Sequence, residues 1–377
     1  MSVIYLDNNA TTAVLPQVVA AMGPYFSEYW GNPSSAYRFG ASVKDAIELA
    51  RNQVGQLIGA NSTEVTFTSG ATEANNTAIH AALATQVDKR HIITSSVEHS
   101  SVLGLCQFLE RHNIQVTYLP VNGSGQFDLG ALESAIRPST AVVSLMWANN
   151  ETGVVFPVDA IAAICTRKGV RFHCDAVQAI GKLPINFQAV PIDYLALSGH
   201  KIGAPKGIGA IVTRAGVPFE GLLIGGKQES GRRGGTESVP LIVALGTACA
   251  AICEQGFAKW QEIALLRDYL EERIFAAIPQ AYRNGAIENR LPNTSNFGVP
   301  GIDSDGIVAF MDGHDICVSS GAACLEESIS PSHVVLAMSG NYQRANEALR
   351  VSLGLNTTKS EIDCFVDLLC ALVSASR

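Results

Sequence analysis

The stretch AVVSLMWANNETGVVFPVDAIAAICTRKGVRFHCDA (141–176) contains two apolar runs separated by a segment with helical periodicity. The runs are AVVSLMWAN (141–149) and VRFHCDA (170–176), and the helix is expected near 159–169. The order strand, helix, strand is typical of two parallel strands joined by a crossover helix. This stretch therefore predicts a mainly parallel sheet that is buried on both faces.

Apolar runs of the same kind recur from residue 60 to residue 215. Those expected to form strands are EVTFTS (64–69), HIITSS (91–96), QVTYLP (115–120), DYLALSG (193–199) and GIGAIVT (207–213). Further helices are expected near residues 71–86, 99–112 and 129–136. Together with the two runs above, this alternation predicts an α/β fold with a mainly parallel, seven-stranded sheet.

The rest of the chain predicts a second domain. A glycine-rich loop, GGKQESGRRGGTES (225–238), precedes a helical tract that continues to about residue 275, and further apolar runs follow. A chain of 377 residues is long for one hydrophobic core. We therefore expect a large domain over 15–260 and a smaller α+β domain over 1–14 and 261–377.

Composition and charge argue against several classes of protein. The chain carries 26 Lys and Arg against 34 Asp and Glu, a net charge of −8, and a negative field repels nucleic acid and anionic lipid. Hydrophobic residues make up 47% of the chain, so we expect a folded protein rather than a disordered one. The apolar stretch 239–253 is short for a bilayer span and is expected to be a buried helix, and we expect no membrane partner.

Cysteine usage indicates the compartment. Nine cysteines occur without a CxxC pair, and the N-terminal sequence MSVIYLDNNATT lacks the apolar region of a signal peptide. Free thiols are typical of a reducing compartment, so we expect a cytoplasmic protein. Cys249 and Cys253 lie one helical turn apart, but other ligands are missing from their neighbourhood, and we expect no metal site.

Polar and reactive groups follow five of the predicted strands. They are residues 68–72, 98–99, 149–151 and 198–201, together with Asp175 at the end of its strand. Ligands of open α/β sheets bind outside the carboxyl ends of the strands. The sequence therefore predicts one active site, around which all these groups gather.

Two of these segments suit a phosphate and an aldehyde. SGAT (69–72) enters a helix, so its backbone N–H groups and hydroxyls can bind a phosphate, although Glu73 also allows a simple capping box. A lysine held away from water can attack an aldehyde and form a Schiff base. Lys201 follows an apolar strand and is our candidate, while composition allows Lys206 equally.

Asp175 completes the requirements of pyridoxal 5'-phosphate. That cofactor needs a lysine, a phosphate site and a carboxylate that keeps the pyridine nitrogen protonated. Gln178, one turn after Asp175, can donate to the ring oxygen. His99 can stack on the ring and move protons, although a lone histidine at a strand end is more often structural.

Ten sequence blocks occur in order along most of the chain: YLDNNATT (5–12), GNPSSAYRFG (31–40), FTSGATEANN (67–76), EHSS (98–101), NNETGVV (149–155), DAVQAIGKLPI (175–185), SGHKIGAPKGIGA (198–210), GGKQESGRRGGTES (225–238), SSGAAC (319–324) and LRVSLG (349–354). Together they resemble the cysteine desulfurases of the NifS/IscS group. These are pyridoxal phosphate enzymes of the class V aminotransferase family, with the aminotransferase fold, type I.

The resemblance implies which residues form the site. Those implied for the cofactor ring are Lys201, Asp175, Gln178 and His99. Those implied for its phosphate are Ala71, Thr72, Ser198, His200 and, from the other subunit of a homodimer, Thr236. Those implied for the substrate carboxylate are Asn150 and Arg350, and a guanidinium fits a carboxylate well. The catalytic residues are expected to be Cys324, Lys201 and His99.

The implied reaction converts L-cysteine to L-alanine and leaves the sulfur as a persulfide on Cys324. The sulfur would then pass to an iron–sulfur cluster scaffold or another sulfur carrier. Cys324 ends a run of small residues and precedes a polar loop that ends at Pro331, which indicates a movable thiol. In isolation, a buried structural cysteine would be the alternative.

Some positions depart from the family pattern. Tyr37 and Leu336 stand where a histidine and an arginine are usual. Glu326 and Glu327 follow Cys324, where small hydroxyl residues are usual, and their charges would disfavour a thiolate. Two alternatives remain, a selenocysteine lyase or other pyridoxal phosphate enzyme of the same fold, and a catalytically silent sulfur-trafficking partner.

Overall fold

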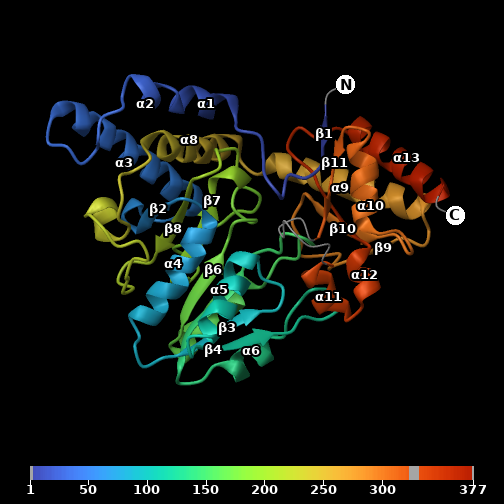
Figure 1. Cartoon of the computed structure of the whole chain (residues 1–377), viewed down its shortest axis with the longest axis horizontal. Helices are drawn as coiled ribbons and strands as arrows, with labels where there is room; N and C mark the ends of the chain where they lie inside the picture. The colour runs from blue at the N-terminus through green and yellow to red at the C-terminus, as the bar shows by residue number, and fades with distance from the viewer. Residues whose placement is uncertain (1–2, 322–330, 376–377) are drawn as a thin grey trace.

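The computed structural model describes residues 3–321 and 331–375. Its centre is a seven-stranded sheet with strand order β2-β8-β7-β6-β5-β3-β4 (Figure 1). The strands are β2 (Val65–Thr68), β3 (His91–Ser95), β4 (Gln115–Leu119), β5 (Thr140–Met146), β6 (Arg171–Asp175), β7 (Tyr194–Ser198) and β8 (Gly209–Thr213). Only β8 in this sheet runs antiparallel to its neighbours. The seven predicted strands and the mainly parallel sheet are confirmed.

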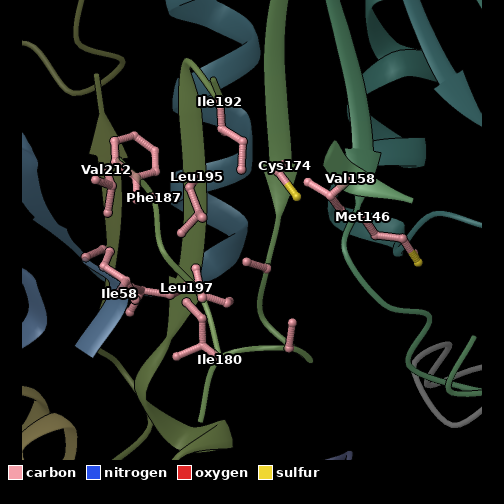
Figure 2. Close-up of a cluster of buried hydrophobic side chains, with 14 of the residues drawn as sticks. Ile58, Met146, Val158, Cys174, Ile180, Phe187, Ile192, Leu195, Leu197 and Val212 are labelled. Atoms are coloured by element: carbon pink, nitrogen blue, oxygen red, sulfur yellow. The ribbon is translucent and has the colours of Figure 1, made fainter. Parts of the chain in front are cut away.

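Helices cover both faces of this sheet (Figure 1). One face packs against α4 (Ala71–Ala84) and α5 (Ser100–Glu110), and the other against α3 (Arg38–Ile58), α6 (Leu129–Ala135), α7 (Val158–Lys168) and α8 (Val239–Gln255). Successive strand residues point to opposite faces of a sheet. Ala196 therefore belongs to the apolar cluster on the α4 and α5 face, whereas Leu195 and Leu197 belong to the cluster on the opposite face. Figure 2 shows these two leucines between Val212 and Cys174 of the neighbouring strands. Burial on both faces explains why the strands are continuous apolar runs.

A separate apolar cluster lies beside the seven-stranded sheet, mainly in the part of the chain drawn in orange and red in Figure 1. Its helices are α9 (Ala258–Ala277), α10 (Ser304–Asp312) and α13 (Lys359–Ala375). Its antiparallel sheet has the order β12 (Ser319–Ser320), β13 (Ala348–Ser352), β10 (Thr294–Gly298), β9 (Tyr282–Arg283). The N-terminal strand β1 (Ile4–Tyr5) pairs with β11 (Ile316–Cys317), and Leu6 is buried in this cluster. The chain therefore begins in the small body and crosses to the large one.

The remaining described elements are short. They are α1 (Pro16–Met22), α2 (Pro24–Ser27), α11 (His333–Ser339), α12 (Tyr342–Asn346), and the 3₁₀ turns η1 (Ser62–Glu64), η2 (Gly199–Lys201) and η3 (Gln228–Gly231). Of these, α1 and α2 pack on α8, and η2 carries the lysine that follows β7.

The helical tract expected after residue 238 contains two helices, the buried one expected from the apolar stretch 239–253 and a second one after it. It breaks at Gly256, whose φ of 66° is left-handed, so α8 and α9 meet at 82°. The buried α8 stays on the large body, while α9 enters the small one and its Trp260 donates to the carbonyl of Gly181 at 2.5 Å. Within the described residues no single helix has the length and apolarity to cross a membrane, although α8 and α9 as a bent pair have both.

Gly246 of α8 generates a prediction, because α3 crosses directly over it. A Cβ there would lie 2.5 Å from Cα of Ala50. Gly246→Ala is expected to destabilise the protein by about 1–3 kcal/mol, since overpacking forces the helices apart. Gly104→Ala in α5 is the control, because no other segment within residues 3–321 and 331–375 comes within 4 Å of a Cβ placed there. Thermal unfolding is expected to show a lower melting temperature for the first variant and an unchanged or higher one for the second. Equal melting temperatures would contradict the prediction.

Candidate active site

The predicted site residues lie at the carboxyl end of the central sheet. Asp175 ends β6 and Ser198 ends β7, while His99 is the residue just before α5, in the connection from β3. Asn150 follows β5, and Ala71 is the first residue of α4, which follows β2. Because these strands point the same way, the fold brings the five residues to one edge.

Lys201 and Gln178 meet at one backbone carbonyl. The Nζ of Lys201 donates to the carbonyl oxygens of Asn9 at 2.5 Å and Ala10 at 2.7 Å. The side-chain amide of Gln178 donates to the same Asn9 oxygen at 3.0 Å. Lys206, the alternative lysine, is exposed. The geometry therefore favours Lys201 as the amine that would bind an aldehyde.

The Asp175 carboxylate is buried and held by two N–H donors. The Nδ2 of Asn75 donates to one oxygen at 2.7 Å, and the backbone N–H of Val177 donates to the other at 3.0 Å. Two donors on one carboxylate fix its plane. A fixed carboxylate at a strand end is suited to pairing with a protonated ring nitrogen.

His99 caps α5, and this contact decides which ring nitrogen carries the proton. Its Nδ1 accepts the backbone N–H of Ser101 at 3.1 Å, so a neutral His99 carries its proton on Nε2. Burial lowers the pKa of His99, the Asp175 carboxylate opposes this, and the charges of Lys201 and Arg350 add to it. The neutral ring thus offers an N–H donor at Nε2 rather than a lone pair.

The N-terminus of α4 offers backbone donors to an anion. Gly70 is its N-cap residue and no side chain of residues 3–321 or 331–375 caps it, so the capping box considered from the sequence does not form. A Cβ at Gly70 would meet no atom of the described residues within 4 Å, so they leave the space there open. The helix dipole and the N–H groups of Ala71 and Thr72 therefore fit a phosphate.

Two further residues implied for the phosphate follow in and after β7. Ser198 is buried and stands opposite Gly209 of β8. A Cβ at Gly209 would lie 2.9 Å from Cα of Gly70, so β8 passes directly behind the N-terminus of α4 and brings Ser198 near it. His200 faces the N-terminal segment instead, with Nδ1 3.2 Å from Oγ1 of Thr11, and burial lowers its pKa to about 4.

The glycine-rich loop after β8 is tied to the large body by two ion pairs. Arg233 donates to Glu73 of α4 at 3.0 Å. Glu229 is buried and receives two hydrogen bonds from Arg51 of α3, at 2.6 and 2.8 Å. These contacts hold the loop in place, and Thr236 near its end is exposed.

Arg350 and Asn150 meet where the two bodies face each other. Arg350 Nη1 donates to the backbone oxygen of Asn150 at 3.2 Å, and Nη2 pairs with Asp7 at 2.8 Å. Arg350 Nε and Asn150 Oδ1 are buried and have no hydrogen-bond partner among the described residues. Because buried polar atoms are rarely left unpaired, these two atoms indicate a position for a polar ligand. A guanidinium there suits a carboxylate.

The residues present fit pyridoxal phosphate. The open N-terminus of α4 suits the phosphate, the buried Asp175 suits the ring nitrogen, and Lys201 suits the aldehyde. Arg350 lies on the side of the small body, where a substrate carboxylate would approach. The chain thus offers one position for the cofactor and an adjoining one for an amino acid.

Sequence reasoning assigned no role to three residues of this site, Asn9, Asn75 and Lys182. Lys182 is buried, and its Nζ donates to the side-chain oxygen of Gln178 at 2.8 Å. Burial lowers the pKa of Lys182 to about 7, and the charge of Lys201 contributes. Each of the three lies within a quoted sequence block. Spacing along the chain does not reveal their contacts with distant segments, such as that of Lys182 Nζ with Oδ1 of Asn9 at 3.5 Å.

Five further positions were singled out from the sequence, and the structure describes two of them. Cys324, Glu326 and Glu327 lie outside the described residues. Tyr37 is the N-cap residue of α3 and is exposed, and Leu336 lies in α11 against a small apolar cluster.

Comparisons with known proteins agree with this geometry. The aminotransferase class-V family model matches residues 4–365. The chain is 49% identical over 377 residues to cysteine desulfurase 2 of Trichormus variabilis, covering all of this chain and 94% of that protein. A NifS-like protein superposes with a TM-score of 0.92 at 34% identity, covering 99% of both chains. SspA in complex with cysteine superposes with a TM-score of 0.83 at 35% identity, covering 94% of this chain and all of that one. The chain therefore belongs to the class-V aminotransferase family, within the group of cysteine desulfurases related to NifS.

Proposed function

We propose that this chain is a pyridoxal phosphate-dependent cysteine desulfurase, which converts L-cysteine to L-alanine and passes the sulfur on as a persulfide. The observation that carries the proposal is that Lys201, Asp175 and Arg350 all lie near enough to His99 for their charges to shift its pKa. Full-length relatives that bear this name support it, and the SspA structure with cysteine supports the substrate.

Each residue of the site has a task in this reaction. When bound, pyridoxal phosphate supplies an aldehyde that exchanges amines and a ring that withdraws electrons from the α-carbon of an amino acid. Arg350 and Asn150 hold the substrate carboxylate and so orient the α-carbon. Lys201, as a free amine, takes the α-proton and returns it. Because Nδ1 of His99 is engaged by Ser101, His99 acts as a donor through Nε2, which leaves Lys201 as the base.

We assign the sulfur acceptor to Cys324. The substrate C–S bond breaks as a new S–S bond forms to the Cys324 sulfur, and the carbon that loses sulfur gains a proton. L-cysteine and the Cys324 thiol thus give L-alanine and a Cys324 persulfide, so that the carbon is reduced and sulfur is oxidised in balance. An iron–sulfur cluster scaffold or another sulfur carrier in the cytoplasm would then accept the sulfur. The eight cysteines of the described residues are free, which supports a reducing compartment.

We also propose a homodimer in which Thr236 reaches the phosphate of the partner's cofactor. Thr236 is exposed, and large apolar side chains are exposed in two loops and helix ends, with Trp30 at 70% and Ile224 at 91%. Exposed apolar side chains mark an interface when they form a contiguous patch. Sedimentation equilibrium is expected to give twice the mass of one chain. A monomer at micromolar concentration would contradict the proposal.

The first test is Cys324→Ala with Cys364→Ala as its control, since Cys364 is also a free thiol and is exposed. With L-cysteine and a reductant, sulfide and alanine formation is expected to fall about a thousandfold or more in the first variant only. Cofactor absorbance is expected to remain in both, because the thiol does not hold the cofactor. In a separate sample with L-cysteine but no reductant, intact mass spectrometry is expected to find one added sulfur atom in the parent chain. Full activity of Cys324→Ala, or a higher kcat/KM for L-selenocysteine than for L-cysteine, would count against this function.

The second test is Arg350→Lys. Lysine cannot reproduce the guanidinium fork, so the KM for L-cysteine is expected to rise roughly tenfold to a hundredfold, the worth of a charge-assisted hydrogen bond. Arg290→Lys is the control, because Arg290 also has a buried, unpaired Nε but pairs with Glu271 in the small body. Steady-state kinetics and cofactor absorbance are the measurements. An unchanged KM in Arg350→Lys would remove Arg350 from the substrate site.

A further inference from the structure

Behind Asp175 a line of buried hydrogen bonds crosses the sheet to β5. Ser144 Oγ lies 2.8 Å from Nδ1 of His173, Nε2 of His173 lies 3.1 Å from Oδ1 of Asn75, and Nδ2 of Asn75 lies 2.7 Å from Oδ2 of Asp175. Ser144, His173 and Asn75 have no exposed surface. The line runs from Ser144 on β5 to His173 on β6, then to Asn75 on α4 and back to Asp175 on β6, so each hydrogen bond joins two different elements.

The carboxylate at one end sets the direction of every bond in this line. A carboxylate oxygen accepts, so Asn75 must present its amide N–H to Asp175 and its amide oxygen to His173. His173 must therefore donate from Nε2, which leaves Nδ1 as the acceptor for the Ser144 hydroxyl. Burial lowers the pKa of His173 to about 4, although the Asp175 charge opposes this, so the ring is neutral at physiological pH. The neutral tautomer with its proton on Nε2 fits every contact.

Through Ser101, Asn75 is also linked to His99, the residue proposed to stack on the cofactor ring. The same Nδ2 donates its other hydrogen to Oγ of Ser101 at 2.9 Å, and that oxygen lies 2.9 Å from Nδ1 of His99. One amide therefore orients both the carboxylate meant for the ring nitrogen and the histidine meant for the ring face. A rotation of this amide would place its oxygen against Asp175, where two acceptors repel.

We propose that Asn75 and His173 are positioning residues of the cofactor site, with His173 locking the Asn75 amide so that it holds Asp175 and His99 in register. This inference rests on the proposed function, because the roles of Asp175 and His99 come from it. Asn75 and His173 touch neither cofactor nor substrate in this account. Their effect is transmitted through hydrogen-bond direction, which chemistry at position 173 can test.

The test compares three variants. His173→Leu removes both hydrogen bonds, whereas His173→Gln keeps an N–H donor at about the place of Nε2. His91→Leu is the matched control, since His91 on β3 is equally buried and also bonds two side chains, Thr140 and Thr117. Apoprotein of each is titrated with pyridoxal phosphate, and the dissociation constant, the visible absorption maximum, kcat and KM are measured.

His173→Leu is expected to weaken cofactor binding about tenfold or more and to shift the absorption maximum, because Asp175 loses an oriented, charge-assisted donor. Its kcat is expected to fall more than its KM changes. His173→Gln is expected to recover most of these values, and His91→Leu to keep them. Ser144→Ala, which keeps His173 but frees its tautomer, is expected to shift the same values by less, and it serves if His173→Leu does not fold.

The outcomes separate the two proposals. If the unaltered chain binds no pyridoxal phosphate, the proposed function fails and this inference fails with it. If the unaltered chain binds it but His173→Leu and Ser144→Ala match His91→Leu in affinity and absorption, this inference alone is wrong. If His173→Gln is as impaired as His173→Leu, donation from position 173 is not the cause and the inference is again overturned.

Discussion

The N-terminal segment at residues 7–10 holds the two halves of the site together. It leaves the small body after β1, and its buried carbonyl at Asn9 requires a donor. Lys201 meets that requirement from the end of β7, while Asp7 pairs with Arg350 of β13. Lys201, the amine for the cofactor, and Arg350, the guanidinium for the substrate, thus come from separate bodies. The segment of residues 7–10 contacts both and sets the distance between them.

The interior around that segment contains many buried polar groups. Burying a polar group costs free energy unless the group is hydrogen-bonded. Most are paired between elements that are distant in the sequence, as Asn75 of α4 is with Asp175 of β6. A network that is satisfied in one arrangement resists any other, so the orientation of the catalytic groups follows from the fold. Among the described residues, the Nε of Arg350 is buried and unpaired, and it lies where the substrate carboxylate is expected. The unpaired Oδ1 of Asn150 is an acceptor and suits a donor group of the substrate. Preorganised groups of this kind stabilise charge that develops during a reaction.

The apolar runs predicted the sheet well because its strands are buried on both faces, which leaves little room for polar residues within them. The same reasoning predicted that polar residues after β3, β5, β6 and β7 would share one edge, and the fold brings them there. The sequence predicted the site less well where the same residues allowed two different arrangements. The residues also allowed a capping box at Glu73, but Glu73 pairs with Arg233 and accepts the backbone N–H of Ser69 at 2.8 Å, and no side chain of the described residues caps the helix at Gly70. Lys201 and Lys206 were likewise equivalent until one proved exposed.

From its residues alone, the chain could be assigned its α/β class, its strands, the edge that carries the site and, through a family resemblance, its cofactor and reaction. These depend on patterns within a few residues, or on motifs that keep their order. The contacts of Asn9 with Gln178, Asn75 with Asp175, and Lys182 with Asn9 came from three-dimensional packing alone, because each joins segments whose separation carries no local signal. The proton position on His99 rests instead on a local contact, the backbone N–H of Ser101 two residues along the chain. It is fixed only once α5 begins at Ser100 and turns that N–H toward the ring.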